Sequence, residues 1–244
     1  MIPKIIHCCW FGGNPLPKSV KKFMDTWRKQ LPDYEVIVWT EKEFDPMASI
    51  PYVREAYMSS KFAFVSDYVR LYALDKFGGI YMDTDVEVIK SLDTFLNNEA
   101  FMSFESNDKL STAIIASVPS ASWIKNLLVE YENRRFIIDG KLDLTTNVEF
   151  ITERFIRDGL KTTNEYQDLD GISIYPSEYF SPKSWGTGVY NITDKTVAIH
   201  HFAGTWHSRS TRMLSCFFSN NTIVKIAALK ERITNTLKNV FTKS

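Results

Sequence analysis

The chain has 244 residues, of which 44% are hydrophobic and 24% charged, and its formal net charge at pH 7 is zero. This composition is typical of a globular domain with a sizeable core, and it excludes an overall charge that would attract nucleic acid. The three cysteines cannot all pair with one another, and the first residues lack the features of a signal peptide. We therefore expect reduced thiols and a cytoplasmic location.

The first forty residues alternate between strand and helix patterns. Residues 4–10 form a short apolar run that predicts a buried strand, and residues 18–30 have helical spacing. A second strand is predicted over residues 35–39. Such a β-α-β unit normally contains parallel strands joined by a right-handed crossover.

The clearest helix is predicted over residues 60–77, and Gly78 and Gly79 end it as glycine caps do. Its apolar side chains recur on one side, at Phe62, Val65, Val69 and Tyr72. Later strands are expected over residues 80–82, 86–89, 100–104, 112–117, 172–175 and 196–201. Later helices are expected over residues 120–133, 147–158 and 222–240. The alternation predicts an α/β fold with a mostly parallel central sheet.

Two aspartates, Asp83 and Asp85, follow the strand predicted at residues 80–82, in the string GGIYMDTDVEVI. Two carboxylates this close repel each other, so we expect a positive charge between them. A turn with two solvated acids is the simpler interpretation of an isolated DxD. Because loops at the ends of sheet strands often hold ligands, the context here favours a cation site.

Asp67 and Arg70 are polar residues in an otherwise apolar helix, three positions apart and therefore on one face. One interpretation is an intrahelical ion pair, which contributes only tenths of a kcal/mol. Next to a DxD, the same pair also suits hydrogen bonding to the hydroxyl groups of a sugar.

Two adjacent histidines, His200 and His201, lie in the string AIHHFAGTWH at the end of a predicted strand. Neighbouring strand residues point to opposite faces, so at most one of the two is expected to face a site. Imidazole together with carboxylates favours Mn²⁺ over Mg²⁺ as the bound ion.

The strings IPKIIHCCWFGG, SDYVRLYALDKFGGIYMDTDVEV and IHHFAGTWH resemble the bacterial members of a glycosyltransferase family. That family contains the yeast initiating α-1,6-mannosyltransferase and is similar to the glucosylating domains of large clostridial toxins. The resemblance covers roughly the first 100 residues and the stretch near residue 200. It implies a GT-A-type nucleotide-sugar-binding fold, here over residues 1–212, with a metal-dependent active site that retains the anomeric configuration.

The resemblance also implies roles for individual residues. Asp67 and Arg70 would hold the donor sugar, Asp83 would contact the sugar or the ribose, and Asp85 would bind a metal that bridges the diphosphate. Mn²⁺, or Mg²⁺ in its place, is the implied ion, with Asp83 beside it. The other nucleotide-sugar contacts that the resemblance implies are made by Trp10, Tyr81, Thr205 and Trp206.

The choice between the histidines also rests on the resemblance. His201 and Gly204 match an HxxG pattern that binds metal in related retaining galactosyltransferases, so His201 is chosen over His200. Thr205 stands where relatives usually have serine. Trp10 would stack on the nucleotide base, although a tryptophan of the core fits the sequence equally well. Residues 145–147 replace a Thr-Gly-Pro turn of many relatives, so acceptor contacts at that turn do not carry over.

The expected function is transfer of a hexose from a nucleotide sugar, with UDP-hexose preferred, to a glycan acceptor such as a lipid-linked capsular or surface polysaccharide. No second carboxylate is placed by the sequence as a covalent nucleophile, which favours front-face attack by the acceptor hydroxyl. A haloacid-dehalogenase-type phosphatase that uses Asp83 is one alternative. A non-catalytic carbohydrate-binding domain is the other.

The last forty residues differ in charge from the rest of the chain. Residues 205–244 contain seven Lys or Arg and one acid, Glu231. Apolar residues recur at helical spacing between basic ones over residues 222–241, so residues 213–244 are predicted to be a basic amphipathic helix. Such a helix either packs on the domain or lies on an anionic membrane surface, which would place the protein at the inner face of the cell membrane.

Overall fold

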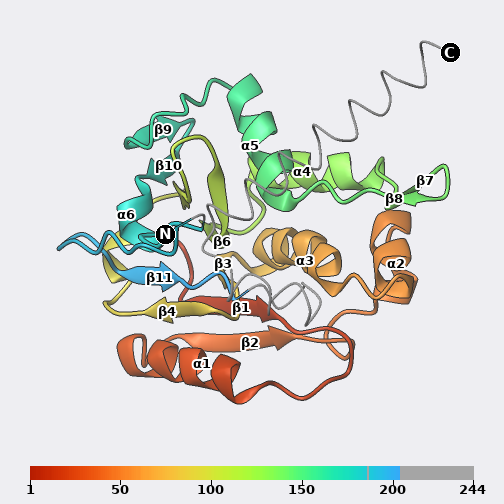
Figure 1. The fold of residues 1–244 in the computed structure, drawn as a ribbon, viewed down its shortest axis with the longest axis horizontal. Coiled ribbons are helices and arrows are strands. Elements are labelled where there is room, and N and C mark those ends of the chain that lie inside the picture. Colours follow the sequence, from red (N-terminus) through yellow and green to blue (C-terminus); the bar gives the residue numbers. More distant parts are fainter. Residues whose placement is uncertain (186, 204–244) are drawn as a thin grey trace, which may run out of the picture.

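The computed structural model of the chain describes residues 1–185 and 187–203 (Figure 1). The helix predicted over residues 222–240, and with it the segment 213–244, lies outside the described residues. The centre of the structure is a seven-stranded sheet with the strand order β2-β1-β3-β6-β5-β10-β9. These strands are β1 (Ile5–Cys9), β2 (Glu35–Trp39), β3 (Gly79–Met82), β5 (Ala100–Phe104), β6 (Leu110–Ser117), β9 (Gln167–Leu169) and β10 (Ile172–Tyr175).

The sheet is mixed but mostly parallel. Strand β1 pairs in parallel with both β2 and β3, and β5 pairs in parallel with β10. Strand β6 lies between β3 and β5 and is antiparallel to both, and β9 is antiparallel to β10 at the edge. Strands β1, β2, β3, β5 and β10 therefore run in one direction, which confirms the α/β fold class with a mostly parallel sheet that is expected of a GT-A-type domain.

Two layers cover the sheet (Figure 1). One face packs against α1 (Lys18–Gln30) and a two-stranded sheet formed by β4 (Val86–Val88) and β11 (Ala198–His200). The other face packs against four helices, α2 (Pro51–Met58), α3 (Phe62–Phe77), α4 (Ser122–Glu132) and α5 (Asn147–Arg157). The remaining elements within the described residues are a hairpin of β7 (Ile137–Ile138) and β8 (Lys141–Leu142), the short helix α6 (Ser177–Phe180), and two 3-10 helices, η1 (Pro46–Ala48) and η2 (Asp93–Phe95).

Helix α1 positions the two-stranded sheet of β4 and β11. The indole Nε1–H of Trp27, near the C-terminal end of α1, donates to the backbone oxygen of Val86 at 2.8 Å. The hydroxyl of Thr26 accepts from the backbone N–H of Val88 at 3.0 Å. Helix α1 thereby holds β4, and with it the residues that immediately precede β4 in the chain.

Helix α3 lies within the core rather than at its surface. Its prediction as a helix is correct, but the single apolar stripe is not observed: Phe62 and Tyr72 are only partly buried, whereas Asp67 and Arg70 are buried. The reason is that α3 packs between the sheet and the helices α2 and α4, so it has almost no solvent-facing side. The two polar residues that the sequence singles out are therefore part of the interior.

The connection from α3 to β3 requires glycine. Gly78 caps the helix with φ of +64° and donates its N–H to the carbonyl of Leu74. Gly79 follows with φ of +99°, and a Cβ there would lie 2.5 Å from the backbone oxygen of Ile5. Only glycine adopts these conformations without strain. The chain thus passes directly from the helix that carries Asp67 into the strand that ends before Asp83.

Several short elements were not predicted, namely α2, α6, β9 and the β7–β8 hairpin. Among the residues that the structure describes, none of the helices has the length and apolarity needed to cross a membrane.

Candidate active site

The carboxyl ends of three parallel strands meet at one edge of the sheet. Trp10 follows β1, Glu41 follows β2 by two residues, and Asp83 follows β3. A cavity of about 870 Å³ opens at the ends of β1 and β2, and its lining includes Trp10, Glu41 and Tyr57. The indole Nε1–H of Trp10 donates to the backbone oxygen of Asn14 at 2.7 Å. Trp10 is partly buried: it packs against the core and also lines the cavity.

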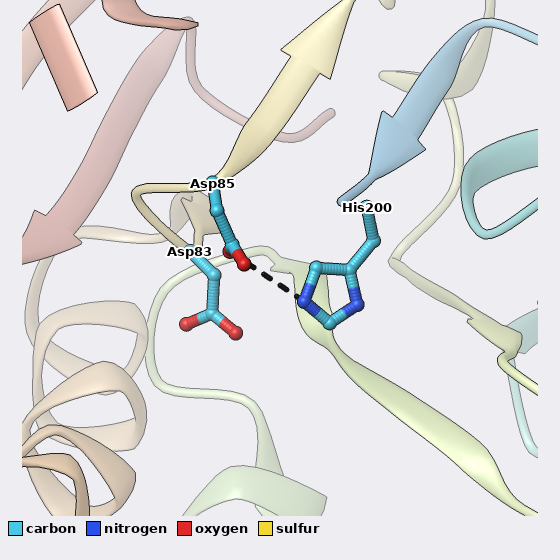
Figure 2. A group of neighbouring side chains, drawn as sticks. All are labelled: Asp83, Asp85 and His200. Atoms are coloured by element: carbon cyan, nitrogen blue, oxygen red, sulfur yellow. Dashed lines mark ion pairs between the residues drawn. The ribbon is translucent and has the colours of Figure 1, made fainter. Parts of the chain in front are cut away.

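Beside this edge, Asp83, Asp85 and His200 form a group of three metal-ligand side chains (Figure 2). One potential ligand atom from each residue lies within 4.8 Å of the others. Asp83 follows β3, Asp85 precedes β4, and His200 ends β11, which pairs with β4 so that His200 lies opposite Val86. The pairing of β4 with β11 joins residues more than 100 positions apart in the sequence.

Charge interactions within the group are strong. His200 Nε2 lies 3.5 Å from Asp85 Oδ1, and Asp85 Oδ2 accepts the backbone N–H of Ala203 at 2.7 Å. Burial alone would raise the pKa of Asp85, but His200 and the Ala203 N–H outweigh it, so this pKa lies below its ordinary value. Burial lowers the pKa of His200, and the neighbouring carboxylates, Asp85 first, more than reverse that effect.

The donor set of the group fits a divalent cation. Two carboxylates and one imidazole can supply oxygen and nitrogen ligands to Mn²⁺ or Mg²⁺, and the negative charges compensate the charge of the ion. The Nδ1 atom of His200 is buried and has no hydrogen-bond partner within the described part of the chain. The ring nitrogen that faces the acids is Nε2, 3.5 Å from Asp85 Oδ1, so Nε2 is the atom that a metal ion held by the two aspartates would reach, whereas Nδ1 points away from them (Figure 2).

Arg70 connects the DxD to the preceding helix. Its Nη2 lies 2.7 Å from Asp67 Oδ1, its Nη1 donates to the backbone oxygen of Thr112 at 2.6 Å, and the same Nη1 lies 3.6 Å from Asp83 Oδ1. The guanidinium carbon lies 4.4 Å from the centre of the Tyr81 ring. The intrahelical pair expected from the spacing is therefore present, but it is buried and forms one corner of a network.

Tyr81 and Asp67 belong to the same network. The hydroxyl of Tyr81 donates to Asp83 Oδ1 at 2.8 Å, and the ring is buried beneath it. Tyr81 thus holds the first aspartate of the DxD in place. Burial raises the pKa of Asp67 to about 6, with Arg70 acting in the opposite direction.

The second histidine lies elsewhere. His201 Nε2 is 2.8 Å from Glu87 Oε2, and its ring stacks on Phe23 of α1 with the ring centres 4.8 Å apart. The two adjacent histidines point to different sides, as the strand alternation predicts. The structure brings His200, and not the sequence-chosen His201, to the aspartates. Gly204, Thr205 and Trp206 lie outside the described residues.

Glu105 is a residue near the site that the sequence analysis missed. It directly follows β5, and its carboxylate makes no hydrogen bond or ion pair within residues 1–185 and 187–203. Burial raises the pKa of Glu105 to about 7; His200 lowers that pKa and Asp83 raises it further. Both partners belong to the three-residue group, so Glu105 is a third carboxylate, close to Asp83 and Asp85. Its position at the carboxyl end of a predicted strand was the available signal.

Comparison with known proteins is consistent with this site. Residues 17–102 match the family model described as a glycosyltransferase sugar-binding region containing a DXD motif, and this range includes both aspartates and Arg70. Over 122 residues the chain is 30% identical to a mannosyl phosphorylinositol ceramide synthase of Saccharomyces cerevisiae, which covers 49% of this chain and 32% of that protein. Over 131 residues it is 28% identical to the initiation-specific alpha-1,6-mannosyltransferase of Candida albicans, which covers 50% of this chain and 34% of that protein.

The chain thus spans about a third of the length of these two relatives. Among solved structures, a galactosyltransferase in complex with donor and acceptor sugar analogues is similar with a TM-score of 0.45 and 13% identity, over 92% of this chain and 95% of that one. The match of residues 17–102 contains the DxD and the helix that precedes it. Residues 17–102 of this chain are thus similar to glycosyltransferase sugar-binding regions that contain a DXD motif.

Proposed function

We propose that this chain is a metal-dependent, retaining glycosyltransferase that moves a hexose from a nucleotide sugar to a hydroxyl group of a glycan acceptor. The observation that carries this proposal is the group of Asp83, Asp85 and His200 at the sheet edge, next to a cavity walled by Trp10. A bound divalent cation would supply Lewis-acid stabilisation of the departing diphosphate. We assign its ligands to these three residues.

Residues around the proposed metal site would bind the nucleotide and the sugar of the donor. Trp10 would stack on the base of the nucleotide within the cavity. One carboxylate oxygen of Asp67 pairs with Arg70. The other carboxylate oxygen would accept a hydrogen bond from the sugar. Tyr81 and Arg70 would hold Asp83 in a fixed orientation toward the donor. For the donor itself, UDP-hexose is the first candidate and GDP-mannose the second.

The remaining alternatives receive less support. A haloacid-dehalogenase-type phosphatase would use Asp83 as a nucleophile, but Asp83 Oδ1 accepts a hydrogen bond from Tyr81 and lies near Arg70. A carbohydrate-binding domain without activity would not need two carboxylates and an imidazole within 4.8 Å.

The proposal is tested by calorimetry with UDP and GDP, each with and without Mn²⁺. We expect one of the two to bind with Mn²⁺ and to bind far more weakly without it, and the corresponding nucleotide sugar to be hydrolysed slowly in the absence of acceptor. Lack of binding by either nucleotide in Mn²⁺ or Mg²⁺ would contradict the proposal. Turnover of p-nitrophenyl phosphate that disappears in Asp83→Asn would support the phosphatase instead.

We further propose that the basic segment 213–244 attaches the protein to an anionic membrane surface, where a lipid-linked acceptor would be available. Its support is the sequence alone, in which basic residues alternate with apolar ones at helical spacing. Each basic residue near such a surface contributes about 1 kcal/mol. We expect the full chain to float with vesicles that contain anionic lipid at low salt and to detach at high salt. Equal flotation of a chain truncated after residue 212 would contradict this role.

A further inference from the structure

A second cavity lies apart from the one at the ends of β1 and β2. Its volume is about 420 Å³, within the range of roughly 300 to 1,000 Å³ that is usual for small-molecule sites. Three segments surround it: the turn before β9, helix α6, and the loop before β11 (Figure 1). Its lining includes Asn164, Tyr166, Glu178, Tyr179, Asn191 and Lys195. No residue of the metal-ligand group lines it, so it is separate from the candidate active site.

The walls of this cavity are fixed by hydrogen bonds between its own side chains. Asn164 bonds Ser177 twice, because its Nδ2 donates to the Ser177 hydroxyl at 3.1 Å and its Oδ1 accepts the Ser177 N–H at 2.7 Å. Glu178, on α6, accepts from Lys195 at 2.9 Å and from the hydroxyl of Thr193 at 3.0 Å. These bonds join the turn before β9 and the loop before β11 to α6, so the cavity is preorganised.

Two tyrosine rings line the cavity. Tyr166 is 56% exposed, but its ring packs against Tyr175 with the ring centres 5.3 Å apart, and its hydroxyl lies 3.3 Å from that of Ser173. The ring of Tyr179 packs against Tyr175 as well, with the ring centres 5.0 Å apart, and its hydroxyl makes no hydrogen bond within the described residues. An exposed aromatic ring that is held in place offers an apolar face to a ligand.

The charges of the cavity favour a neutral ligand. Among the described residues that line it, Lys195 carries the only positive charge, and it is paired with Glu178. Glu165 adds a carboxylate, so a phosphate group would meet no unpaired cation. The exposed amide of Asn191 makes no hydrogen bond within the described part of the chain and can both donate and accept. Aromatic faces, amides and hydroxyls together suit a sugar, which has an apolar C–H face and a rim of hydroxyl groups.

The cavity lies within reach of the candidate active site. The Cα atoms of Lys195 and His200 are five residues apart in the sequence and therefore at most about 18 Å apart in space. Ser181, directly after α6, has its hydroxyl 3.3 Å from that of Ser111. Ser111 precedes Thr112, whose backbone oxygen belongs to the hydrogen-bond network of the DxD. A glycan whose reacting end lies at the metal-ligand group can therefore reach the cavity with a unit further along its chain.

We propose that this cavity binds a neutral sugar unit of the acceptor glycan, distant from the hydroxyl group that receives the hexose. Tyr166 stacks on the apolar face of that unit, and Asn191 and the Tyr179 hydroxyl bind its hydroxyl groups. The inference rests on the proposed function and adds a preference for acceptor length to it. Longer acceptors bind better than short ones, because only they reach both sites.

The experiment titrates the full chain, without nucleotide or Mn²⁺, with linear tetrasaccharides of glucose, galactose, mannose and N-acetylglucosamine, and follows binding by saturation-transfer NMR. We expect at least one of these four tetrasaccharides to bind. Tyr166→Ala should weaken its binding by about 10-fold, because the stacking face is lost. Tyr166→Phe keeps that face and should retain most of the affinity.

Two further variants separate recognition from stability. Asn191→Ala removes an exposed amide that holds no other side chain of the described residues, and it should weaken binding of the same tetrasaccharide by about 3- to 10-fold. Ile138→Ala is the matched control, because Ile138 on β7 is 54% exposed, close to the exposure of Tyr166, and does not line the cavity. It should bind the tetrasaccharide as the unaltered chain does.

Acceptor kinetics connect the cavity to transfer. With the nucleotide sugar that the unaltered chain hydrolyses as donor, the tetrasaccharide that binds should have a lower KM than the disaccharide of the same sugar. In Tyr166→Ala this difference in KM should disappear, whereas kcat for the tetrasaccharide should be retained. An equal KM for both lengths in the unaltered chain, or no transfer to the tetrasaccharide that binds, would overturn the acceptor role of the cavity.

The outcomes distinguish this inference from the proposed function. If none of the four tetrasaccharides binds, or if Tyr166→Ala and Asn191→Ala bind as the unaltered chain does, the inference is wrong, and Mn²⁺-dependent binding of UDP or GDP still supports the proposed function. Losses of affinity that follow the melting temperatures of the variants, Ile138→Ala included, also overturn the inference. If a tetrasaccharide binds through Tyr166 but neither nucleotide binds, the proposed function fails, and the cavity belongs to a carbohydrate-binding domain instead.

Discussion

Replacing Arg70 with methionine is expected to lower the free energy of unfolding by about 3 to 5 kcal/mol, because it leaves a buried charge without its partner. The side chain of Arg70 is 6% exposed, and it pairs with Asp67 at 2.7 Å. It also donates to the backbone oxygen of Thr112, at the strand that separates β3 from β5. Without the guanidinium, the Asp67 carboxylate and the Thr112 carbonyl both lose a buried hydrogen bond.

Urea unfolding followed by circular dichroism measures this effect. The chain contains a matched control, because Arg28 pairs with Asp25 at the same i, i+3 spacing in α1, with both side chains more than 60% exposed. Arg28→Met should change stability by no more than a few tenths of a kcal/mol. A loss in Arg70→Met as small as that in Arg28→Met would show that the buried network does not stabilise the fold.

The buried contacts of Arg70 give it a structural role in addition to the role predicted from the sequence. From the sequence, Arg70 is either a residue that holds the donor sugar or one half of an intrahelical ion pair that contributes only tenths of a kcal/mol. In the structure it is bonded to the protein on several sides, and its nearest group in the DxD is Asp83. A loss of activity in Arg70 variants is therefore interpretable only at a temperature where the variant is folded.

Replacing His200 with alanine is expected to weaken Mn²⁺-dependent binding of the nucleoside diphosphate by about 100-fold or more, since it removes one of the three proposed ligands. His201→Ala should change that affinity by less than about threefold, because His201 contacts Glu87 and Phe23 instead of the aspartates. The two histidines are adjacent, so each variant is the control for the other.

Calorimetric titration of Mn²⁺ together with the nucleotide distinguishes the two variants directly. Asp85→Asn should resemble His200→Ala, because Asp85 and His200 face each other at 3.5 Å. The reverse pattern, with His201→Ala losing affinity and His200→Ala retaining it, would favour the ligand chosen from the HxxG pattern and exclude the group of Asp83, Asp85 and His200.

Much of the fold could be predicted from local pattern. The bounds of α1, β2, β5 and β10 agree with the ranges expected from the sequence, because each is an apolar run or a helical repeat between clear turn residues. Short elements such as the β7–β8 hairpin escaped prediction, since two-residue strands with exposed side chains have no periodicity of their own.

The candidate site could likewise be predicted only in part from the sequence. A DxD after a short strand, and an aspartate and an arginine on one helix face, are visible in the sequence because they depend on neighbouring residues. Alternation along a strand predicts that His200 and His201 point apart, but not which of them faces Asp85. That choice depends on the antiparallel pairing of β11 with β4, whose partners are more than 100 residues apart.

The sequence by itself therefore determined the α/β class, the β-α-β unit and the position of the DxD, all of which follow from spacing over a few residues. Only the tertiary structure decided that Arg70 is buried, since α3 is covered on both sides by elements distant in sequence. The order of β3, β6 and β5 decided that Glu105 lies near Asp83. Contacts between separate elements leave no pattern in either element alone, so neither placement could be predicted from the sequence.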